Sequence, residues 1–180
     1  MEPTKTYYSS EITSTLLVSA DSSSSSNNST PLNTVLREAT IEDVQSVYDL
    51  LCKIKAFHGR DPSTIKIENL RTHLFGEKPR ASVILAEIEK KIAGFAIYYI
   101  GFSGFEAQPE LCLEDLYIEE AHRRKGIGSR LFEKIEERAR DNQCCRIAFI
   151  VAKDNKNAID FYNKHKAVER KQLSIFRKNM

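Results

Sequence analysis

A short basic, glycine-containing segment, residues 123–128 (Arg-Arg-Lys-Gly-Ile-Gly), has the residue types needed to bind a diphosphate. It follows an apolar, strand-like run that ends near Ile118, and it precedes a helical pattern that begins at Ile127. Glycines at such a junction leave backbone amides uncovered at the positive end of the helix, where a phosphate or pyrophosphate binds best. The basic residues before the glycines add charge of the matching sign. The segment therefore predicts a diphosphate ligand.

Two common diphosphate motifs do not fit this segment. A Walker loop ends in Gly-Lys-Ser/Thr after a four-residue gap, and no such sequence occurs here. A dinucleotide-binding loop has a third glycine after two more residues, and Leu131 stands at that position. What remains is the pattern Arg/Gln-x-x-Gly-x-Gly after an apolar strand, filled by Arg123, Gly126 and Gly128.

A second motif, Asn155-x-x-Ala158-x-x-Phe161-Tyr162, lies on a predicted helix that follows the next strand. With both motifs at this separation, residues 34–178 resemble the Gcn5-related N-acetyltransferase superfamily. The resemblance implies an α/β fold with a mixed, mostly antiparallel central sheet and helices on both faces. It also implies acetyl-CoA as a cosubstrate and no metal. The strands at 94–99 and 113–117 and the segment 75–79 resemble, more narrowly, the diamine (spermidine/spermine) N-acetyltransferase family.

By this resemblance, Glu114 and Tyr162 carry the chemistry of acetyl transfer to an amine. The amine arrives as an ammonium ion with a pKa of about 10, so a base must take its proton. Glu114 is expected to be this base and to act through water. Tyr162 matches the general acid that protonates the departing thiolate, because a phenol stays protonated at neutral pH. The alternative to the catalytic role is an ordinary outward-facing strand carboxylate for Glu114 and a core aromatic residue for Tyr162. Asp115 is expected on the opposite face of the strand if pairing is regular, as a structural residue or a substrate contact.

The same resemblance assigns binding of the acetyl donor mainly to the backbone. Leu116 and Ile118 would pair with the pantetheine amides as an added strand pairs with a sheet edge. Arg123 would add positive charge, and Asn155 would hydrogen-bond the donor, with a helix N-cap as the alternative. Tyr162 would also contact the donor. The pyrophosphate would be cradled by the backbone amides of one continuous run: Arg124, Lys125, Gly126, Ile127, Gly128 and Ser129.

The acceptor side departs from the diamine family in two places. Phe57-His58 stands at the end of the first helix, where a Tyr-Glu pair is usual, and residues 103–105 lack the usual acid. Two lost carboxylates would weaken a polycation site by roughly several kcal/mol unless Asp61 and Glu106 replace them. The predicted substrate contacts are Glu114, Asp115, His58 and Glu106.

We therefore expect transfer to a primary amine of a small molecule, a diamine or polyamine first and a thialysine-like amino acid next. Two alternatives stay open. One is a protein lysine or N-terminal acetyltransferase, and the other is a non-catalytic acyl-CoA-binding module. A homodimer is typical of the family that the chain resembles.

Composition adds further expectations. The 27 basic and 25 acidic residues nearly balance, and no apolar run reaches the roughly 18–20 residues of a membrane span, so neither a nucleic-acid nor a membrane partner is expected. Four cysteines without CxxC spacing indicate reduced thiols in the cytoplasm, and four scattered histidines show no metal spacing. Residues 1–33 are rich in Ser and Asn and are expected to form a disordered tail before a domain at 34–180. Organelle targeting by this tail stays open.

Hydrophobic spacing predicts the elements that must position these residues. In chain order we expect a strand (35–39), two helices (40–57 and 68–75), three strands (81–88, 92–102 and 111–118), a helix from 127, a strand (146–152), a helix (157–166) and a last strand (173–176).

Overall fold

The structure is a computed structural model that describes residues 16–17 and 33–179. Residues 1–15 and 18–32, which make up most of the predicted tail, lie outside the described residues. The described residues therefore cover the predicted acetyltransferase domain up to residue 179 and one short segment before it.

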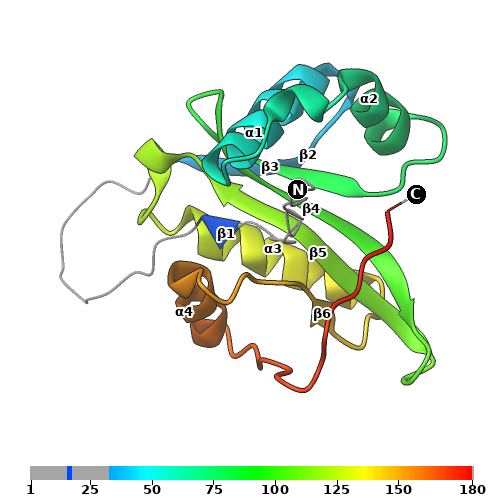
Figure 1. The fold of residues 1–180 in the computed structure, drawn as a ribbon. Coiled ribbons are helices and arrows are strands. Elements are labelled where there is room, and N and C mark those ends of the chain that lie inside the picture. The colour runs from blue at the N-terminus through cyan, green and yellow to red at the C-terminus, as the bar shows by residue number, and fades with distance from the viewer. Residues whose placement is uncertain (1–15, 18–32, 180) are drawn as a thin grey trace, which may run out of the picture.

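One sheet forms the centre of the domain, in the order β1-β5-β4-β3-β2, with β6 also paired to β5 (Figure 1). Strands β2 to β5 pair antiparallel with their neighbours, whereas β1 and β6 run parallel to β5. The strands are β1 (Leu16–Leu17), β2 (Thr34–Glu38), β3 (Ser82–Ile88), β4 (Lys91–Ser103), β5 (Gln108–Ile118) and β6 (Ile147–Ala148).

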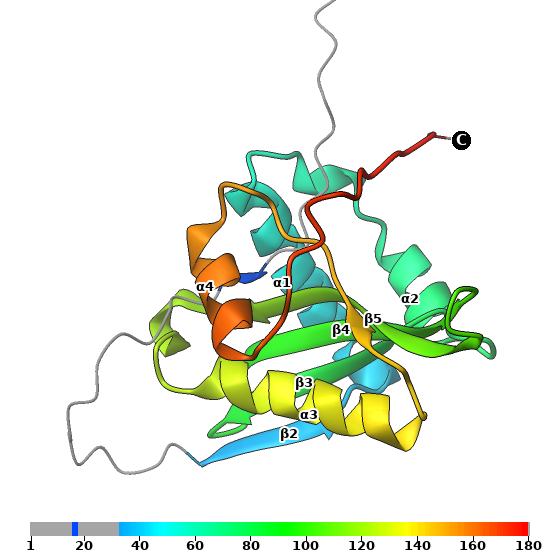
Figure 2. The same ribbon diagram turned by 90° about the horizontal axis from the view of Figure 1, so that it is seen from below.

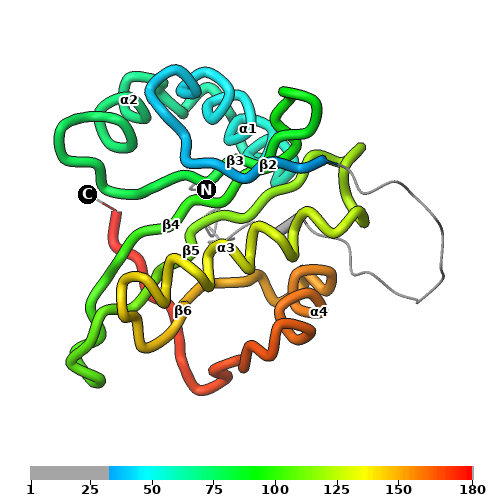
Figure 3. Tube along the Cα trace, turned by 180° about the vertical axis from the view of Figure 1, so that it is seen from behind, coloured from blue at the N-terminus to red at the C-terminus, as the bar shows by residue number. Residues whose placement is uncertain are grey.

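Helices cover both faces of this sheet (Figures 1 and 2). On one face, α1 (Val44–Phe57) and α2 (Ile67–Phe75) pack over a core that includes Phe95 and Tyr117. On the other face lie α3 (Ile127–Asp141) and α4 (Lys156–Lys164). Figure 3, the view from behind, shows α3 lying across the strands. The short 3-10 turns are η1 (Ile41–Asp43), η2 (Pro62–Thr64) and η3 (Glu120–His122). The predicted α/β fold is confirmed.

Two predicted strands were wrong. The strand predicted at 146–152 pairs only over Ile147–Ala148, because the chain then leaves β5. The described residues contain no strand at 173–176; the side chain of Phe176 is 91% exposed there, without a neighbouring strand to pack on. Conversely, Leu16–Leu17, inside the predicted tail, form a strand. Composition did not indicate this strand, because the segment is ordered by its pairing with the edge of β5 and not by burial in a core of its own.

An ion network fixes the start of α1 against β2 and β3. Arg37 donates to the two carboxylate oxygens of Asp43 at 2.7 and 2.8 Å, and to Glu87 at 2.6 Å. Asp43 also accepts the Thr40 N–H at 2.8 Å. The hydrogen bonds from Arg37, and to a lesser extent from Thr40, lower the pKa of Asp43 to about 2. The network therefore ties η1, and with it the start of α1, to β2 and β3.

Candidate active site

The predicted glycine loop joins η3 to the N-terminus of α3. Gly126 is the N-cap residue of α3 and adopts a left-handed conformation (φ 76°), and Arg124 is also left-handed (φ 59°). A Cβ atom added to Gly126 would meet nothing within 4 Å, so the space beside the loop is open. The first amides of a helix have no partner within the helix, and they carry its positive end. Ile127, Gly128 and Ser129 occupy this first turn, so the backbone there can bind an anion.

Two basic residues of this loop donate to the backbone beside it. Arg123 Nε donates to the carbonyl oxygen of Ile118 at 3.0 Å, and its guanidinium lies 5.9 Å from the ring centre of Tyr117. Lys125 Nζ donates to the carbonyl oxygen of Ala121 at 2.8 Å. These contacts shape the turn from β5 into α3, a role that the sequence did not reveal. Added charge toward a diphosphate stays a prediction for both residues.

The end of β5 presents alternate backbone groups to the edge away from β4. Glu119 N–H donates to the carbonyl oxygen of Ala93 at 2.8 Å, on the β4 side. Because backbone groups alternate between the two edges of a strand, those of Leu116 and Ile118 face the other edge. The N–H of Leu111, earlier on β5, points to this same outer edge and donates to the carbonyl oxygen of Arg146 at 3.0 Å. The two residues predicted to pair with pantetheine therefore have the orientation that such pairing needs.

A β-bulge interrupts β5 at the predicted base. Ile97 on β4 lies opposite Asp115, but the next residue, Tyr98, lies opposite Leu113, so Glu114 is an extra residue in β5. The pairing is not regular, and the premise on which Asp115 was expected to face away from Glu114 is wrong. Bulges redirect side chains and are common beside active sites. Glu114 is exposed and Asp115 is half-buried.

Tyr162, the predicted acid, is held in an aromatic cluster. Its ring stacks on Phe149 with centres 3.8 Å apart and an interplanar angle of 24°, and it meets Phe132 edge-on at 5.6 Å. Burial, and secondarily the negative charge of Asp115, raise the pKa of Tyr162 above its usual value. The phenol therefore keeps its proton well beyond neutral pH. The influence of Asp115 also shows that α4 brings this ring near the bulge in β5.

Asn155 positions the helix that carries Tyr162. Its side-chain oxygen accepts the Ala158 N–H at 3.1 Å, which is an N-cap of α4. The N-cap alternative is confirmed, and a hydrogen bond to the donor stays a prediction. Phe149 was missed as a functional candidate; its signal was a large aromatic residue in the apolar run 147–151, next to the second motif.

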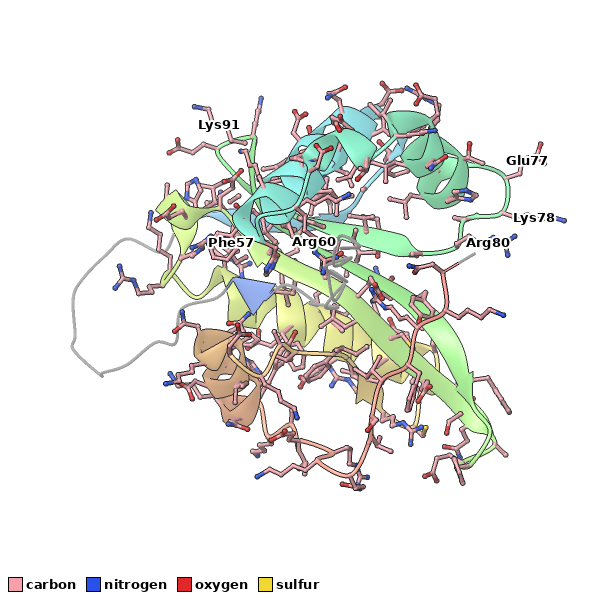
Figure 4. The ribbon with its side chains drawn as sticks, viewed as in Figure 1. Phe57, Arg60, Glu77, Lys78, Arg80 and Lys91 are labelled. Carbon is pink, nitrogen blue, oxygen red and sulfur yellow. The ribbon has the colours of Figure 1, made fainter. Side chains whose placement is uncertain are left out.

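On the acceptor side, the C-terminal end of α1 approaches the loop before α4. Figure 4 shows Phe57 and Arg60 at the end of α1 that lies over β5, whereas Glu77, Lys78 and Arg80 lie at the far end of the sheet. His58 is half-buried and meets the Phe57 ring edge-on, with centres 5.4 Å apart. Burial, and secondarily Arg60, lower the pKa of His58, while Asp154 opposes this shift. His58, at the end of α1, is therefore close enough to the loop before α4 to feel the charge of Asp154.

The two carboxylates expected to compensate for the missing acids have partners of their own. Glu106 lies in the β4–β5 turn, 3.8 Å from Arg146, which also binds Glu110 at 2.7 Å. Asp61 accepts hydrogen bonds from the N–H and hydroxyl of Ser63, at 2.9 and 2.6 Å, and caps η2. The structure therefore gives neither carboxylate an obvious place beside Glu114.

Two features of the described residues bear on other kinds of site. Among residues 16–17 and 33–179, no group of three or more His, Cys, Asp or Glu residues is placed to hold a metal ion. Within the same ranges, no helix combines the length and the apolar character needed to cross a membrane.

Comparison with known proteins decides the family. The model of the acetyltransferase (GNAT) family matches residues 44–166. The chain belongs to this family and is an N-acetyltransferase. Members of the family generally use acetyl-CoA. The superfamily resemblance and the prediction of an enzyme are therefore confirmed.

The similar proteins agree with this assignment. Thialysine N-epsilon-acetyltransferase of Bos taurus is 30% identical over 137 residues, which cover 71% of this chain and 80% of that protein. The human spermidine/spermine N(1)-acetyltransferase-like protein 1 is 25% identical over 142 residues, covering 74% of this chain and 20% of that protein. A crystal structure of a probable acetyltransferase superposes with a TM-score of 0.70 at 21% identity, covering 81% of this chain and 97% of that one, and supports the fold.

Proposed function

We propose that this N-acetyltransferase transfers the acetyl group of acetyl-CoA directly to the primary amine of a small molecule, with Glu114 as base through water and Tyr162 as acid. The observation that carries the proposal is the bulge at Glu114. It lies on the strand whose edge presents Leu116 and Ile118, and Asp115 in the same bulge acts electrostatically on Tyr162. Base, acid and donor-binding edge therefore belong to one region of the molecule.

The chain has the groups to hold acetyl-CoA. The edge of β5 at Leu116 and Ile118 suits the pantetheine amides, since these pair as an added strand would. The first turn of α3, opened by Gly126, suits the pyrophosphate. Bound there, acetyl-CoA supplies an acetyl group already activated as a thioester.

Glu114 and Tyr162 divide the proton transfers between them. Glu114 is exposed, so a water molecule can relay the ammonium proton to its carboxylate. Tyr162 is buried and keeps its proton, which it can give to the departing thiolate. The exposed carboxylate thus accepts the proton of the amine, and the buried phenol donates a proton to the thiolate of coenzyme A.

For the acceptor, the geometry supports a short amine above a long polyamine. A polyamine needs an acid for its distant ammonium group, and Glu106 and Asp61 are engaged with Arg146 and Ser63. The name of the bovine relative supports a thialysine-like amino acid. A diamine or polyamine is the second candidate, favoured by the name of the human relative.

A thiol-release assay with acetyl-CoA and a panel of amines tests the proposal. The panel holds thialysine, lysine, ornithine, putrescine, spermidine and a lysine-containing peptide, with mass spectrometry of the products. We expect turnover of the short amines. Turnover of the peptide alone would show a protein acetyltransferase. Tight acetyl-CoA binding without turnover of any of these amines would contradict the proposed acceptor class.

Two predictions concern the state of the protein in the cell. We propose a homodimer, as is typical of the family that the sequence resembles, and a cytoplasmic location, as the free cysteines suggest. Sedimentation velocity of the full chain, and imaging of the chain with a C-terminal tag, check these two points. A monomer would leave the chemistry above unchanged, whereas an organellar signal would assign targeting to residues 1–33.

A further inference from the structure

The edge of β5 that faces away from β4 is shared by two segments of this chain. β6 pairs with it at Leu111 and Cys112, and β1 pairs with it at Leu116 and Tyr117. After Ala148 the chain leaves β5. Beyond that point, β1 is the only strand among the described residues that pairs with this edge. In Figures 1 and 2, β1 accordingly lies between β5 and α4.

This stretch of edge is also where the proposed function places the pantetheine arm of acetyl-CoA. Backbone groups of Leu116 and Ile118 face it, and a strand edge has one set of these groups, which only one partner can pair at a time. β1 pairs at Leu116, and Arg123 donates to the Ile118 carbonyl oxygen. Both backbone positions assigned to the donor are therefore engaged by the chain itself.

We propose that β1 is an autoinhibitory strand, which competes with acetyl-CoA for the edge of β5. The inference rests on the proposed function, because it concerns regulation of the same site. Its occupant is Leu16–Leu17, which with Val18 forms a short apolar run before the serine-rich stretch. Access of acetyl-CoA then depends on release of this segment from β5.

The length of β1 indicates that the inhibition is reversible. A two-residue strand is much shorter than the usual five or six residues, so it can be displaced. Being part of the same chain, however, it acts at an effective concentration that free ligands must exceed. When a site is free for only a fraction of the time, the apparent dissociation constant of its ligand rises by the inverse of that fraction. We therefore expect release of β1 to strengthen acetyl-CoA binding by about five- to tenfold.

The first experiment compares acetyl-CoA binding, by calorimetry, in the full chain and in two variants. One variant lacks residues 1–32, and the other carries Leu16→Pro and Leu17→Pro, because proline cannot donate to a strand ladder. The matched control carries Ser24→Pro and Ser25→Pro, within the serine run. We expect both β1 variants to bind about five- to tenfold more tightly and the control to behave as the full chain does. Equal affinity in all four proteins would overturn the inference, and so would weaker binding by the β1 variants.

A second experiment separates failure of this inference from failure of the proposed function. Hydrogen exchange of the Leu116 and Ile118 amides is measured without any ligand. Loss of β1 should raise the exchange rate at Leu116 about tenfold or more, because its partner on the open edge is gone, while Glu119, bonded to β4, stays unchanged as an internal control. Faster exchange with no acetyl-CoA binding in any variant would refute the proposed donor site and leave the β1 contact standing. Unchanged exchange would refute the inference alone.

Discussion

The donor side and the acceptor side of β5 are built in different ways. On the donor side, the groups that can bind a ligand are backbone amides and carbonyls, at Leu116, Ile118 and the first turn of α3. On the proposed acceptor side the candidates are side chains, among them His58 and Glu106, which have aromatic or ionic partners of their own. Backbone recognition depends on the fold, whereas side-chain recognition depends on single residues.

This difference explains why the family does not determine the acceptor. A left-handed Gly126 and a bulge in β5 are features that a whole family can share while its side chains vary. An amine, by contrast, is read by the number and position of carboxylates, and one substitution can remove such a group. The comparison can be tested by variants that alter one side and leave the other unchanged.

The largest effect is expected from Tyr162→Phe. The variant keeps the ring that stacks on Phe149 but loses the proton for the departing thiolate, so kcat should fall by about 100-fold with little change in the KM of acetyl-CoA. Because the pKa of Tyr162 is raised, its acid form persists as pH rises, and the wild type should show no loss of kcat from this group below about pH 10. Steady-state kinetics against pH checks both points, with Tyr48→Phe on α1 as control. A Tyr162→Phe enzyme within about twofold of wild type would exclude the acid role.

Glu114→Gln should have the next largest effect, and one that depends on pH. At neutral pH the amine is almost entirely protonated, so loss of the base should lower kcat/KM for the amine by about 30-fold. The deficit should shrink as the pH approaches the amine pKa of about 10, because the substrate then arrives without its extra proton. The exposed Glu133 on α3 provides the control, Glu133→Gln. A deficit that stays constant with pH would show that Glu114 orients the substrate and does not take its proton.

Two glycines allow a matched test of the two sides. Gly126, on the donor side, and Gly59, after α1, are both left-handed (φ 76° and 65°), and neither would bring a new Cβ within 4 Å of another atom. Alanine therefore adds a similar backbone strain of about 1 kcal/mol at each. Gly126→Ala should raise the KM of acetyl-CoA about fivefold and spare that of the amine. Gly59→Ala should leave the KM of acetyl-CoA unchanged. An equal rise of that KM in both variants would mean that the loop at Gly126 is not a donor site.

The sequence predicted the local structure of the glycine loop and of the start of α4 better than it predicted longer-range pairing, for a physical reason. Gly126 is required by its backbone conformation and Asn155 by its N-cap, and both requirements act between near neighbours in the chain. The bulge at Glu114 depends on the register between β4 and β5, which single-strand periodicity cannot reveal. The pairing of Leu16–Leu17 with β5 joins segments far apart in sequence, so no local pattern indicated it.

The strand predicted at 173–176 failed for the opposite reason. Its apolar residues suit a strand, but a strand also needs a partner strand, and this segment pairs with none in the described residues, where Leu173 is 70% exposed. On the acceptor side, the sequence showed which acids were missing. It could not show that Glu106 pairs with Arg146, since these residues belong to different elements.

The smallest effect is expected from Arg146→Gln, which tests whether the acceptor side lacks a carboxylate or only holds one in an ion pair. The substitution removes the partner of Glu106 and Glu110, and exposed pairs of this kind contribute about 0–1 kcal/mol. A released Glu106 should lower the KM of spermidine by about threefold and leave that of thialysine unchanged. Arg138→Gln, on α3, breaks comparable ion pairs with Glu38 and Asp141 and should change the KM of neither amine. If Arg146→Gln altered both amines equally, the β4–β5 turn would not distinguish a second ammonium group, and selection of the acceptor would rest on the bulge in β5 and the end of α1.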